Sequence, residues 1–255
     1  MMQSEKLPLV SVITVSLNSA NSISNALLSV QNQTYPKIQH IVKDGESSDE
    51  TEKIILSHDS NKIAFYKSKD EGIYDALNQA IEYSNGKYII FLHSDDVFKS
   101  KHTIARLISF IIEKKADGAY GDIKFIDESN KLVREWNSSK FKKWKLNFGW
   151  VPPHTSLILK SSIFKKIGNF DTSFKISGDY DHMIRLFLSN RFNILYHEEV
   201  VSIMKIGGAS TGGLKSQLKK IQEDYKVIRK NKLLGIFTLI FKRLGKLKQL
   251  IVIKK

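Results

Sequence analysis

Short apolar runs alternate with runs of helical periodicity over the first 115 residues of the chain. Four apolar runs rich in Val and Ile predict strands, at 9–17, 38–42, 62–66 and 87–92. Four segments repeat their apolar positions every three or four residues and predict helices, at 23–30, 50–56, 72–83 and 103–115. This alternation indicates an α/β fold with a Rossmann-like, mostly parallel central sheet flanked by helices.

The pattern loosens after residue 115. Further extended segments predict strands at 118–126, 131–136, 155–159 and 192–204. Shorter helical segments are expected at 161–166 and 179–188, and an aromatic and basic connector at 141–148. We therefore expect one α/β domain over 1–213, followed by a basic amphipathic helical tail over 214–255.

The net charge of +14 is concentrated in this tail. Residues 214–255 contain 13 Lys and Arg against only Glu223 and Asp224, which gives 13 − 2 = +11 and leaves +3 for residues 1–213. Any acidic partner is therefore expected to meet the tail. Cysteine is absent, which excludes disulfides, thiolate metal sites and a cysteine nucleophile, and fits a reducing cytosol.

The sequence predicts a peripheral rather than a spanning relation to the membrane. No apolar run reaches the roughly 20 residues needed to cross a bilayer, and the run at 9–17 lacks the basic leader of a signal peptide. Within 233–253 the apolar residues recur at helical spacing with Lys and Arg largely off the stripe, as in helices that lie on anionic membranes. The alternatives are a helix packed on the domain or a dimer interface. We expect a cytoplasmic protein held on the inner face of the cell membrane.

Polar side chains follow several predicted strands at the ends where parallel strands gather their loops. These are Asn18, Asp44, and the adjacent Asp95 and Asp96. Ligands of open α/β sheets bind outside these ends, so we expect the four residues to converge on one crevice. Two neighbouring carboxylates suit Mg²⁺ or Mn²⁺ bridging a diphosphate. A solvated turn is the alternative reading of Asp95 and Asp96.

Five segments in order resemble the family-2 glycosyltransferases, at 10–18, 41–51, 70–78, 94–96 and 177–181. The resemblance covers roughly residues 8–210 and extends to bacterial enzymes that build surface polysaccharides. It implies a GT-A fold and an inverting transfer of a sugar from a nucleotide-sugar donor, with a UDP-sugar favoured. The implied acceptor is a hydroxyl of a saccharide or of a lipid-linked saccharide.

The resemblance also implies which residues bind the donor. Asp44 is expected at the nucleobase or ribose with Asn18 beside it, although Asp44 with Gly45 also fits a tight turn. Asp70 and Gly72 are expected to contact the donor, and the alternative for the 70–72 segment is a helix cap. The remaining donor-binding residues implied are Asp75, Asn78, Ser94 and Asp95.

The metal motif departs from the family pattern. The usual motif is Asp-x-Asp, and His93 stands at the position of the first acid. Asp95 and Asp96 are therefore expected to hold the divalent cation, Mg²⁺ or Mn²⁺, with Asp95 in the main role. His93 is either a weak ligand, a sugar contact or a structural histidine.

The implied catalytic base is Asp179. The segment 177–181 matches the family's Glu-Asp-x-Asp with Gly178 in place of Glu, and burial is expected to raise the pKa of Asp179. Asp181 is expected to support the site and to pair with Arg185, one helical turn later. His154 is expected to contact the acceptor or the donor phosphate, and the alternative is a structural histidine. The Gly-rich segment 207–213 is expected to form a lid over the diphosphate.

A nucleic-acid-binding module is the alternative from another class. The basic tail and the aromatic residues Trp136, Phe141, Trp144 and Phe148 among lysines motivate it. No recognised nucleic-acid motif accompanies them, so nucleic acid is not the favoured partner. Oligomeric state is not predicted.

Overall fold

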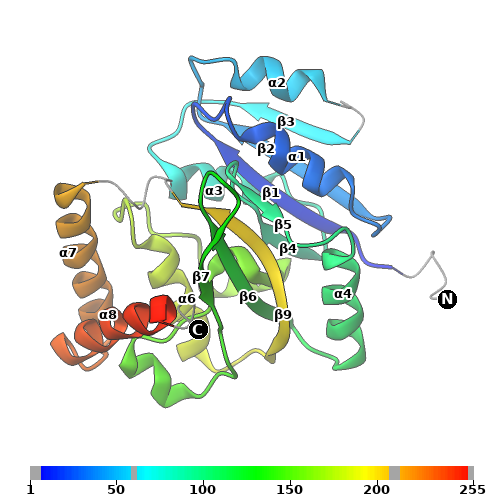
Figure 1. Cartoon of the computed structure of the whole chain (residues 1–255). Coiled ribbons are helices and arrows are strands. Elements are labelled where there is room, and N and C mark those ends of the chain that lie inside the picture. The colour runs from blue at the N-terminus through cyan, green and yellow to red at the C-terminus, as the bar shows by residue number, and fades with distance from the viewer. Residues whose placement is uncertain (1–6, 59–61, 207–212, 252–255) are drawn as a thin grey trace.

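A nine-stranded, mostly parallel sheet with helices on both faces forms the centre of the molecule (Figure 1). The computed structural model describes residues 7–58, 62–206 and 213–251. The strand order is β3-β2-β1-β4-β8-β6-β9-β5, and β7 pairs with β6. β8 runs antiparallel to β4 and β6, β5 to β9, and β7 to β6. The predicted α/β architecture is confirmed.

The elements of the first half follow the predicted alternation. They are β1 (Val10–Ser16), α1 (Ile23–Gln31), β2 (Ile38–Asp44), α2 (Thr51–Ser57), β3 (Ile63–Lys67), α3 (Ile73–Glu82), β4 (Tyr88–Phe91), β5 (Asp96–Phe98) and α4 (Thr103–Glu113). The three-residue strand β5 has no counterpart in the prediction, because it directly follows the acidic turn and is too short to show a period.

The second half adds two antiparallel strands, β7 and β8, and the helix that carries the predicted base, α6. Its elements are β6 (Gly118–Ile126), β7 (Leu132–Trp136), the 3-10 helices η2 (Lys143–Phe148) and η3 (His154–Ser156), β8 (Leu157–Lys160), α5 (Ser161–Ile167), α6 (Gly178–Ser189), β9 (Ile194–Lys205), α7 (Leu214–Lys230) and α8 (Ile236–Ile251). The strand expected at 155–159 begins later, because residues 154–156 form η3.

The core follows from the alternation of side chains along β1. Ile13 and Val15 face one side and pack in a cluster with Leu77 of α3 and Ile184 of α6. Val10 and Val12 face the other side, in a cluster with residues of α1 and α4. Both faces of the strand are therefore buried, which explains its unbroken apolar run.

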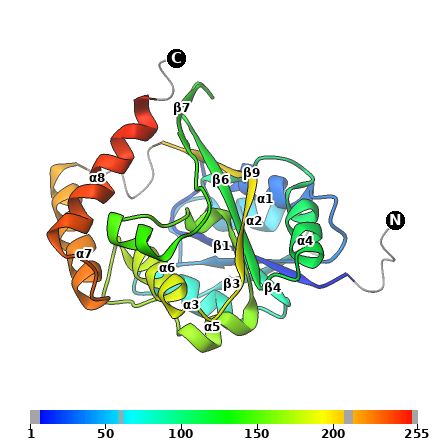
Figure 2. The same ribbon diagram turned by 90° about the horizontal axis from the view of Figure 1, so that it is seen from below.

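The two tail helices pack against α6 and η2 on the side of the molecule opposite α4 (Figure 2). Val227 and Ile228 of α7 and Leu239 of α8 are buried in the same cluster as β1 and α6. The tail predicted to be helical forms two helices, which are separated between Lys230 and Ile236, where Lys232 and Gly235 have φ values of 56° and 60°. No helix in the described part of the chain is long and apolar enough to span a membrane. A domain boundary at 213 stays a prediction.

Candidate active site

The loops after β1, β2 and β4 are joined by side-chain hydrogen bonds at one edge of the sheet. Asn18, with a left-handed φ of 49°, accepts a hydrogen bond from the Ser48 amide (2.9 Å). The hydroxyls of Ser19 and Ser94 lie 2.8 Å apart. The loops that carry Asn18 and Ser94 therefore lie side by side, and contact of these residues with a donor stays a prediction.

Asp44 lies at the end of β2 and is fully buried. Its carboxylate accepts hydrogen bonds from the Ser16 hydroxyl (2.9 Å) and from the hydroxyl and amide of Ser47 (2.6 and 2.7 Å). These bonds close the turn that the Asp44-Gly45 pair indicated. Three donors of the protein already surround the Asp44 carboxylate. The expected contact of Asp44 with a nucleobase or ribose stays a prediction.

Asp70 pairs with a buried lysine of β2, Lys43. Lys43 is fully buried and donates to Asp70 and to the Ser68 carbonyl. The second carboxylate oxygen of Asp70 accepts a hydrogen bond from the Gly72 amide (3.1 Å). Gly72 has a φ of 125°, which favours glycine, and begins α3. The cap interpretation thus has structural support, and donor contact by Asp70 and Gly72 stays a prediction.

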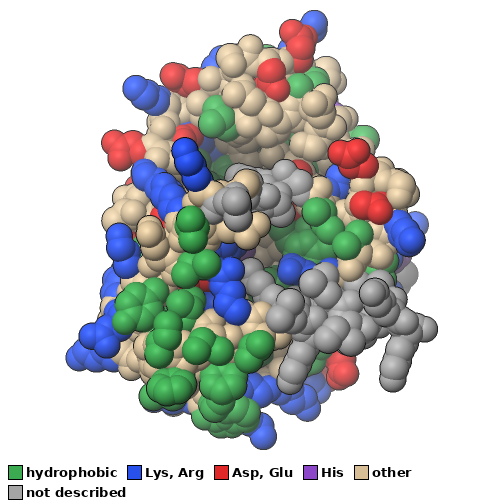
Figure 3. All heavy atoms as spheres, turned by 60° about the vertical axis from the view of Figure 1, so that its left-hand side comes forward, with side chains coloured by type: hydrophobic (Ala, Val, Ile, Leu, Met, Phe, Trp, Pro, Cys, Tyr) green, Lys and Arg blue, Asp and Glu red, His purple; other side chains and the backbone are tan. Residues whose placement is uncertain are grey.

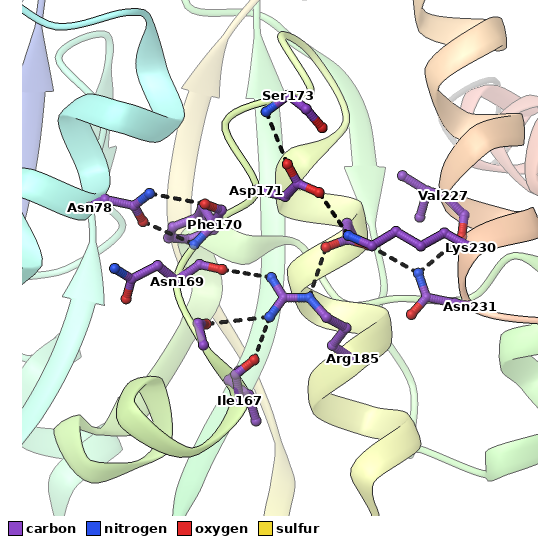
Figure 4. Close-up of polar contacts among 12 residues, drawn as sticks. Asn78, Ile167, Asn169, Phe170, Asp171, Ser173, Arg185, Val227, Lys230 and Asn231 are labelled. Atoms are coloured by element: carbon purple, nitrogen blue, oxygen red, sulfur yellow. Dashed lines mark hydrogen bonds and ion pairs between the residues drawn. The ribbon is translucent and has the colours of Figure 1, made fainter.

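Asp75 and Asn78 of α3 are both engaged with the protein. Asp75 accepts hydrogen bonds from the Glu71 amide (3.0 Å) and from Gln79 (2.9 Å). Asn78 donates to the Phe170 carbonyl and accepts from the Phe170 amide, both at 2.9 Å (Figure 4). Asn78 therefore fixes the loop before α6 against α3, whereas the contacts of Asp75 are local to the start of α3.

The acidic pair after β4 consists of one half-buried and one buried carboxylate. Asp96 is fully buried, and neither of its oxygens has a hydrogen-bond partner among the described residues. Burial, together with the charge of Asp95, raises the pKa of Asp96 well above its ordinary value, and burial also raises that of Asp95. An unpaired buried carboxylate is costly unless a cation or a proton joins it. The two hard oxygen donors therefore fit a divalent cation.

Asp95 and Asp96 do not form a complete metal site by themselves. Within residues 7–58, 62–206 and 213–251, no group of three or more His, Asp or Glu is placed to hold a metal ion. Further ligands would have to come from the diphosphate of a donor or from water, which is usual for Mg²⁺.

A chain of three side chains links the loop between β4 and β5, which contains Asp95, to α6. Nε2 of His93 lies 2.5 Å from Nε2 of His154, and Nδ1 of His154 lies 3.4 Å from Oδ2 of Asp179. Burial, reinforced by His154, lowers the pKa of His93 to about 3, so His93 is neutral. His93, which stands in place of the first Asp of the Asp-x-Asp motif, thus contacts His154.

Tyr74 explains the second departure, at Gly178. A Cβ atom on Gly178 would lie 2.8 Å from the Tyr74 ring, so the ring occupies the space of a larger side chain. The Tyr74 hydroxyl donates to the Ile176 carbonyl (2.7 Å) and to Asp179 (3.2 Å). Burial and the nearby Asp179 raise the pKa of Tyr74 well above 10, which keeps this donor protonated.

Asp179 is ionised over the whole physiological range. Burial acts to raise its pKa, but the hydrogen bond and charge of His154, with the charges of Lys220 and Lys242, outweigh burial and lower the pKa below its ordinary value. The expected upward shift is therefore wrong. The side chain keeps 29% of its surface exposed, so an acceptor hydroxyl can reach it.

The comparisons with known proteins agree with this geometry. The model of the family described as Glycosyl transferase family 2 matches residues 11–184. The chain belongs to glycosyltransferase family 2. An uncharacterised glycosyltransferase of Rickettsia prowazekii is 35% identical over 214 residues, which cover 80% of this chain and 66% of that protein. A PGL/p-HBAD biosynthesis glycosyltransferase of Mycobacterium bovis is 29% identical over 211 residues, covering 80% and 79%.

Solved structures show the same fold. The S. aureus TarS fragment 1–349 in complex with UDP-GlcNAc has a TM-score of 0.70 at 21% identity, covering 88% of this chain and 65% of that one. The mannosyltransferase PcManGT from Pyrobaculum calidifontis, in complex with GDP-Man and Mn²⁺, has a TM-score of 0.64 at 14% identity, covering 95% and 75%. The chain has the GT-A fold, and it spans about two thirds of the Rickettsia relative and of the TarS fragment.

In this family-2 glycosyltransferase, Asp181 and Arg185 form a structural cluster beside the base. Arg185 donates to fully buried Asp181 (2.8 Å), as predicted from their spacing, and also to the Ile167 and Asn169 carbonyls (Figure 4). Lys230 of α7 lies 3.1 Å from Asp181 and 2.8 Å from Asp171. The cluster therefore joins α6, the loop before it and the tail helix.

The sequence did not identify the two tail acids as part of the site. Glu223 accepts hydrogen bonds from the amides of Lys175, Ile176 and Ser177 at 2.8 to 3.1 Å. Asp224 accepts from the Ser177 hydroxyl (2.8 Å) and pairs with Lys242 of α8 (2.7 Å). The one sequence feature that could have pointed to Glu223 and Asp224 is that they are the only acids in the strongly basic segment 214–255. Most of the predicted lid, 207–212, lies outside the described residues.

Proposed function

We propose that the protein is an inverting glycosyltransferase in which Asp179 accepts the proton of an acceptor hydroxyl. The acceptor oxygen then bonds to the anomeric carbon as the bond from that carbon to the nucleoside diphosphate breaks. The observation that carries the proposal is the His93, His154 and Asp179 chain, which connects an ionised, accessible carboxylate to the β4–β5 loop that contains Asp95. This contact supports the proposal that the two acidic groups serve one site, Asp179 as base and Asp95 at the cation.

The proposed cation is Mg²⁺ or Mn²⁺, held by Asp95 and Asp96. The support is the unpaired, buried carboxylate of Asp96 and the presence of Mn²⁺ in the PcManGT complex. When bound, a divalent cation neutralises charge on the departing diphosphate. The chain contributes the two oxygen donors and a neutral His93 nearby, which adds no competing positive charge.

The proposed donor is a nucleotide-sugar, with UDP-sugars favoured and GDP-sugars second. TarS in complex with UDP-GlcNAc and PcManGT in complex with GDP-Man share this fold. The proposed nucleotide-binding end of the site includes Asn18, Asp44 and Asp70. The neighbouring residues proposed to support the donor are Gly72, Asp75, Asn78 and Ser94. Nucleotide and sugar choice depend on pocket shape, which the acidic groups do not fix.

The proposed acceptor is a saccharide or a lipid-linked saccharide of bacterial surface polysaccharide synthesis, and the proposed location is the inner face of the cell membrane. The support is the basic, amphipathic tail and the relation to a PGL/p-HBAD biosynthesis glycosyltransferase. His154, which contacts Asp179, would then lie close to the acceptor hydroxyl.

A nucleic-acid-binding role has less support in the structure. Two of the four aromatic residues that motivated it are already engaged within the protein. Phe141 packs on Trp150 and Phe187, and the Arg134 guanidinium lies 5.7 Å from the centre of the Trp136 ring. Trp144 and Phe148 alone of the four are more than a third exposed, so the set forms no continuous stacking platform.

The decisive experiment is a donor and acceptor screen with matched variants. Thermal shifts with UDP-, GDP- and dTDP-sugars, with and without Mn²⁺, identify the donor, and transfer is then followed with membrane extracts as acceptor. Asp179→Asn and Asp95→Asn should each abolish turnover while the fold is retained, and Glu128→Gln, an exposed acid in the β6 to β7 turn, should leave it unchanged. Full activity of Asp179→Asn would remove the proposed base, and RNA binding without donor binding would favour the alternative.

A further inference from the structure

An apolar surface extends over α8 and η2 on the face of the molecule seen in Figure 3. Four residues of α8 spaced as one helical stripe are 41 to 63% exposed: Phe237, Ile240, Phe241 and Leu244. Two residues of η2 adjoin them, with Trp144 57% and Phe148 44% exposed. The Phe148 ring lies 4.8 Å from that of Phe241 and 5.5 Å from that of Trp144, so the two elements form one surface. We call these six residues the apolar face.

The apolar face is rigidly attached to the domain. The opposite stripe of α8 packs inward, with Thr238 donating to the Asn147 carbonyl (2.8 Å) and Leu239 buried in the core. Gly149 lies against Lys242, where an added Cβ atom would approach the Lys242 Cβ to 2.4 Å and its backbone Cα to 2.6 Å. α8 is therefore already packed on the domain through one stripe, and its other apolar stripe stays exposed.

The charge around the apolar face favours an anionic partner. Lys140, Lys142 and Lys143 precede Trp144 and are exposed, as are Arg229 and Lys232 before α8. The only two acids of the tail, Glu223 and Asp224, are 6% and 2% exposed and bind groups of the domain. They therefore do not offset the basic surface, which would repel the same surface of a second copy.

We infer that the apolar face is a docking surface for an anionic lipid bilayer, with the six apolar side chains entering the headgroup region and the basic residues binding lipid phosphates. Aromatic residues beside Lys and Arg are typical of surfaces that lie in this interface. The inference deepens the proposed membrane location and makes α8 and η2, not the whole tail, its carrier. α7 serves the core and the segment before Asp179.

The docking surface is also directly connected to the catalytic helix. The Lys242 ammonium lies 3.2 Å from the centre of the Tyr180 ring and 2.7 Å from Asp224, which binds Ser177. Both contacts flank Asp179 in sequence. A bilayer held by the apolar face would therefore lie on the side of the molecule that carries α6, where a lipid-linked acceptor has to present its hydroxyl.

The test uses the full chain and vesicles of phosphatidylglycerol and phosphatidylcholine, with phosphatidylcholine alone as the neutral surface. The wild type should sediment with the anionic vesicles at low salt and be released as salt rises. Phe237→Ser with Ile240→Ser, and separately Trp144→Ser, should each weaken binding by roughly tenfold or more. Leu56→Ser of α2, an equally exposed apolar residue at 59%, is the matched control and should bind as wild type.

Two results would overturn the inference. One is full-length protein that ignores anionic vesicles at low salt, or binds them equally well when the apolar face is changed. The other is a wild-type dimer that the face variants convert to a monomer without any loss of vesicle binding, which would make the face an interface between copies. Donor binding, measured by thermal shift on the same variants, should be unchanged. Vesicle binding without any donor binding would reject the proposed function and leave the docking surface standing.

Discussion

Glu223 accepts a hydrogen bond from the amide of Ser177 at 3.0 Å, across 46 residues of sequence and two residues before the proposed base. The same carboxylate also binds the Lys175 and Ile176 amides. These are orphan donors just before the first turn of α6, where a carboxylate is favoured by the helix dipole as well. A residue of the tail therefore fixes the position from which Asp179 enters the site.

Glu223→Ala should lower both stability and turnover. Three amides would lose their acceptor, and we expect the free energy of unfolding to fall by about 1–3 kcal/mol. Displacement of the 175–177 segment should reduce kcat roughly ten- to a hundredfold with little change in the donor KM. Glu223→Gln keeps one oxygen acceptor and should recover much of both losses. Wild-type kcat in Glu223→Ala, with Leu218→Ala on the exposed side of α7 as the control, would contradict this positioning role.

The pH dependence of turnover should reveal the role of His154. A base must be unprotonated, and the lowered pKa of Asp179 means that the wild-type rate should not fall through protonation of this residue between pH 8 and 5. His154→Ala removes the hydrogen bond and charge that oppose burial, so the pKa of Asp179 should rise. The variant should then lose kcat as pH falls through the raised value, whereas His58→Ala should not. Identical normalised kcat profiles would show that His154 does not set this pKa.

Asp96→Asn should stabilise the metal-free protein and abolish its response to metal. The raised pKa means that the folded state binds a proton at Asp96 more tightly than the unfolded state does. Metal-free stability should therefore decrease as pH rises from about 4 through the raised pKa. Removing this charge should raise Tm at pH 7 by roughly 2–4 °C, equivalent to about 1 kcal/mol.

The wild type should gain Tm on addition of Mn²⁺ with donor, and the Asp96→Asn variant should not. Glu128→Gln, which changes an exposed acid, should behave as wild type in both conditions. A metal-free variant that is less stable than wild type, or one that keeps the full Mn²⁺ shift, would count against the assignment of Asp96 to the cation.

Strands β1 and β4 could be read from the sequence because they are short, apolar and buried on both faces. In β1 all seven residues are buried, and the exposed Leu17 and the polar Asn18 follow it. The tail could not be read in the same way. Its apolar positions predicted an amphipathic helix, but α8 has an inward stripe with Leu239 and an outward stripe with Phe237, and periodicity alone does not say which stripe meets the domain.

The departures from the family motifs required long-range contacts to interpret. Gly178 faces the ring of Tyr74, 104 residues earlier, and His93 faces His154, 61 residues later. The pKa of Asp179 went the opposite way from the expectation because His154, Lys220 and Lys242 come from three other elements. The sequence around Asp179 does not show these distant cationic neighbours. The expected shift of its pKa therefore rested on burial alone.

Asn78 offers a direct choice between a donor contact and a structural clamp. Its side chain uses both the amide nitrogen and the oxygen on the backbone of Phe170, and Phe170 packs edge-on against Phe91 in the core. Asn78→Ala should therefore lower the free energy of unfolding by about 1–3 kcal/mol, measured by urea denaturation, and leave the donor Kd within roughly twofold. Asn25→Ala, on the exposed side of α1, controls for loss of a helical Asn. A variant of unchanged stability that binds donor at least tenfold more weakly would instead place Asn78 in the donor site, as the family resemblance implied.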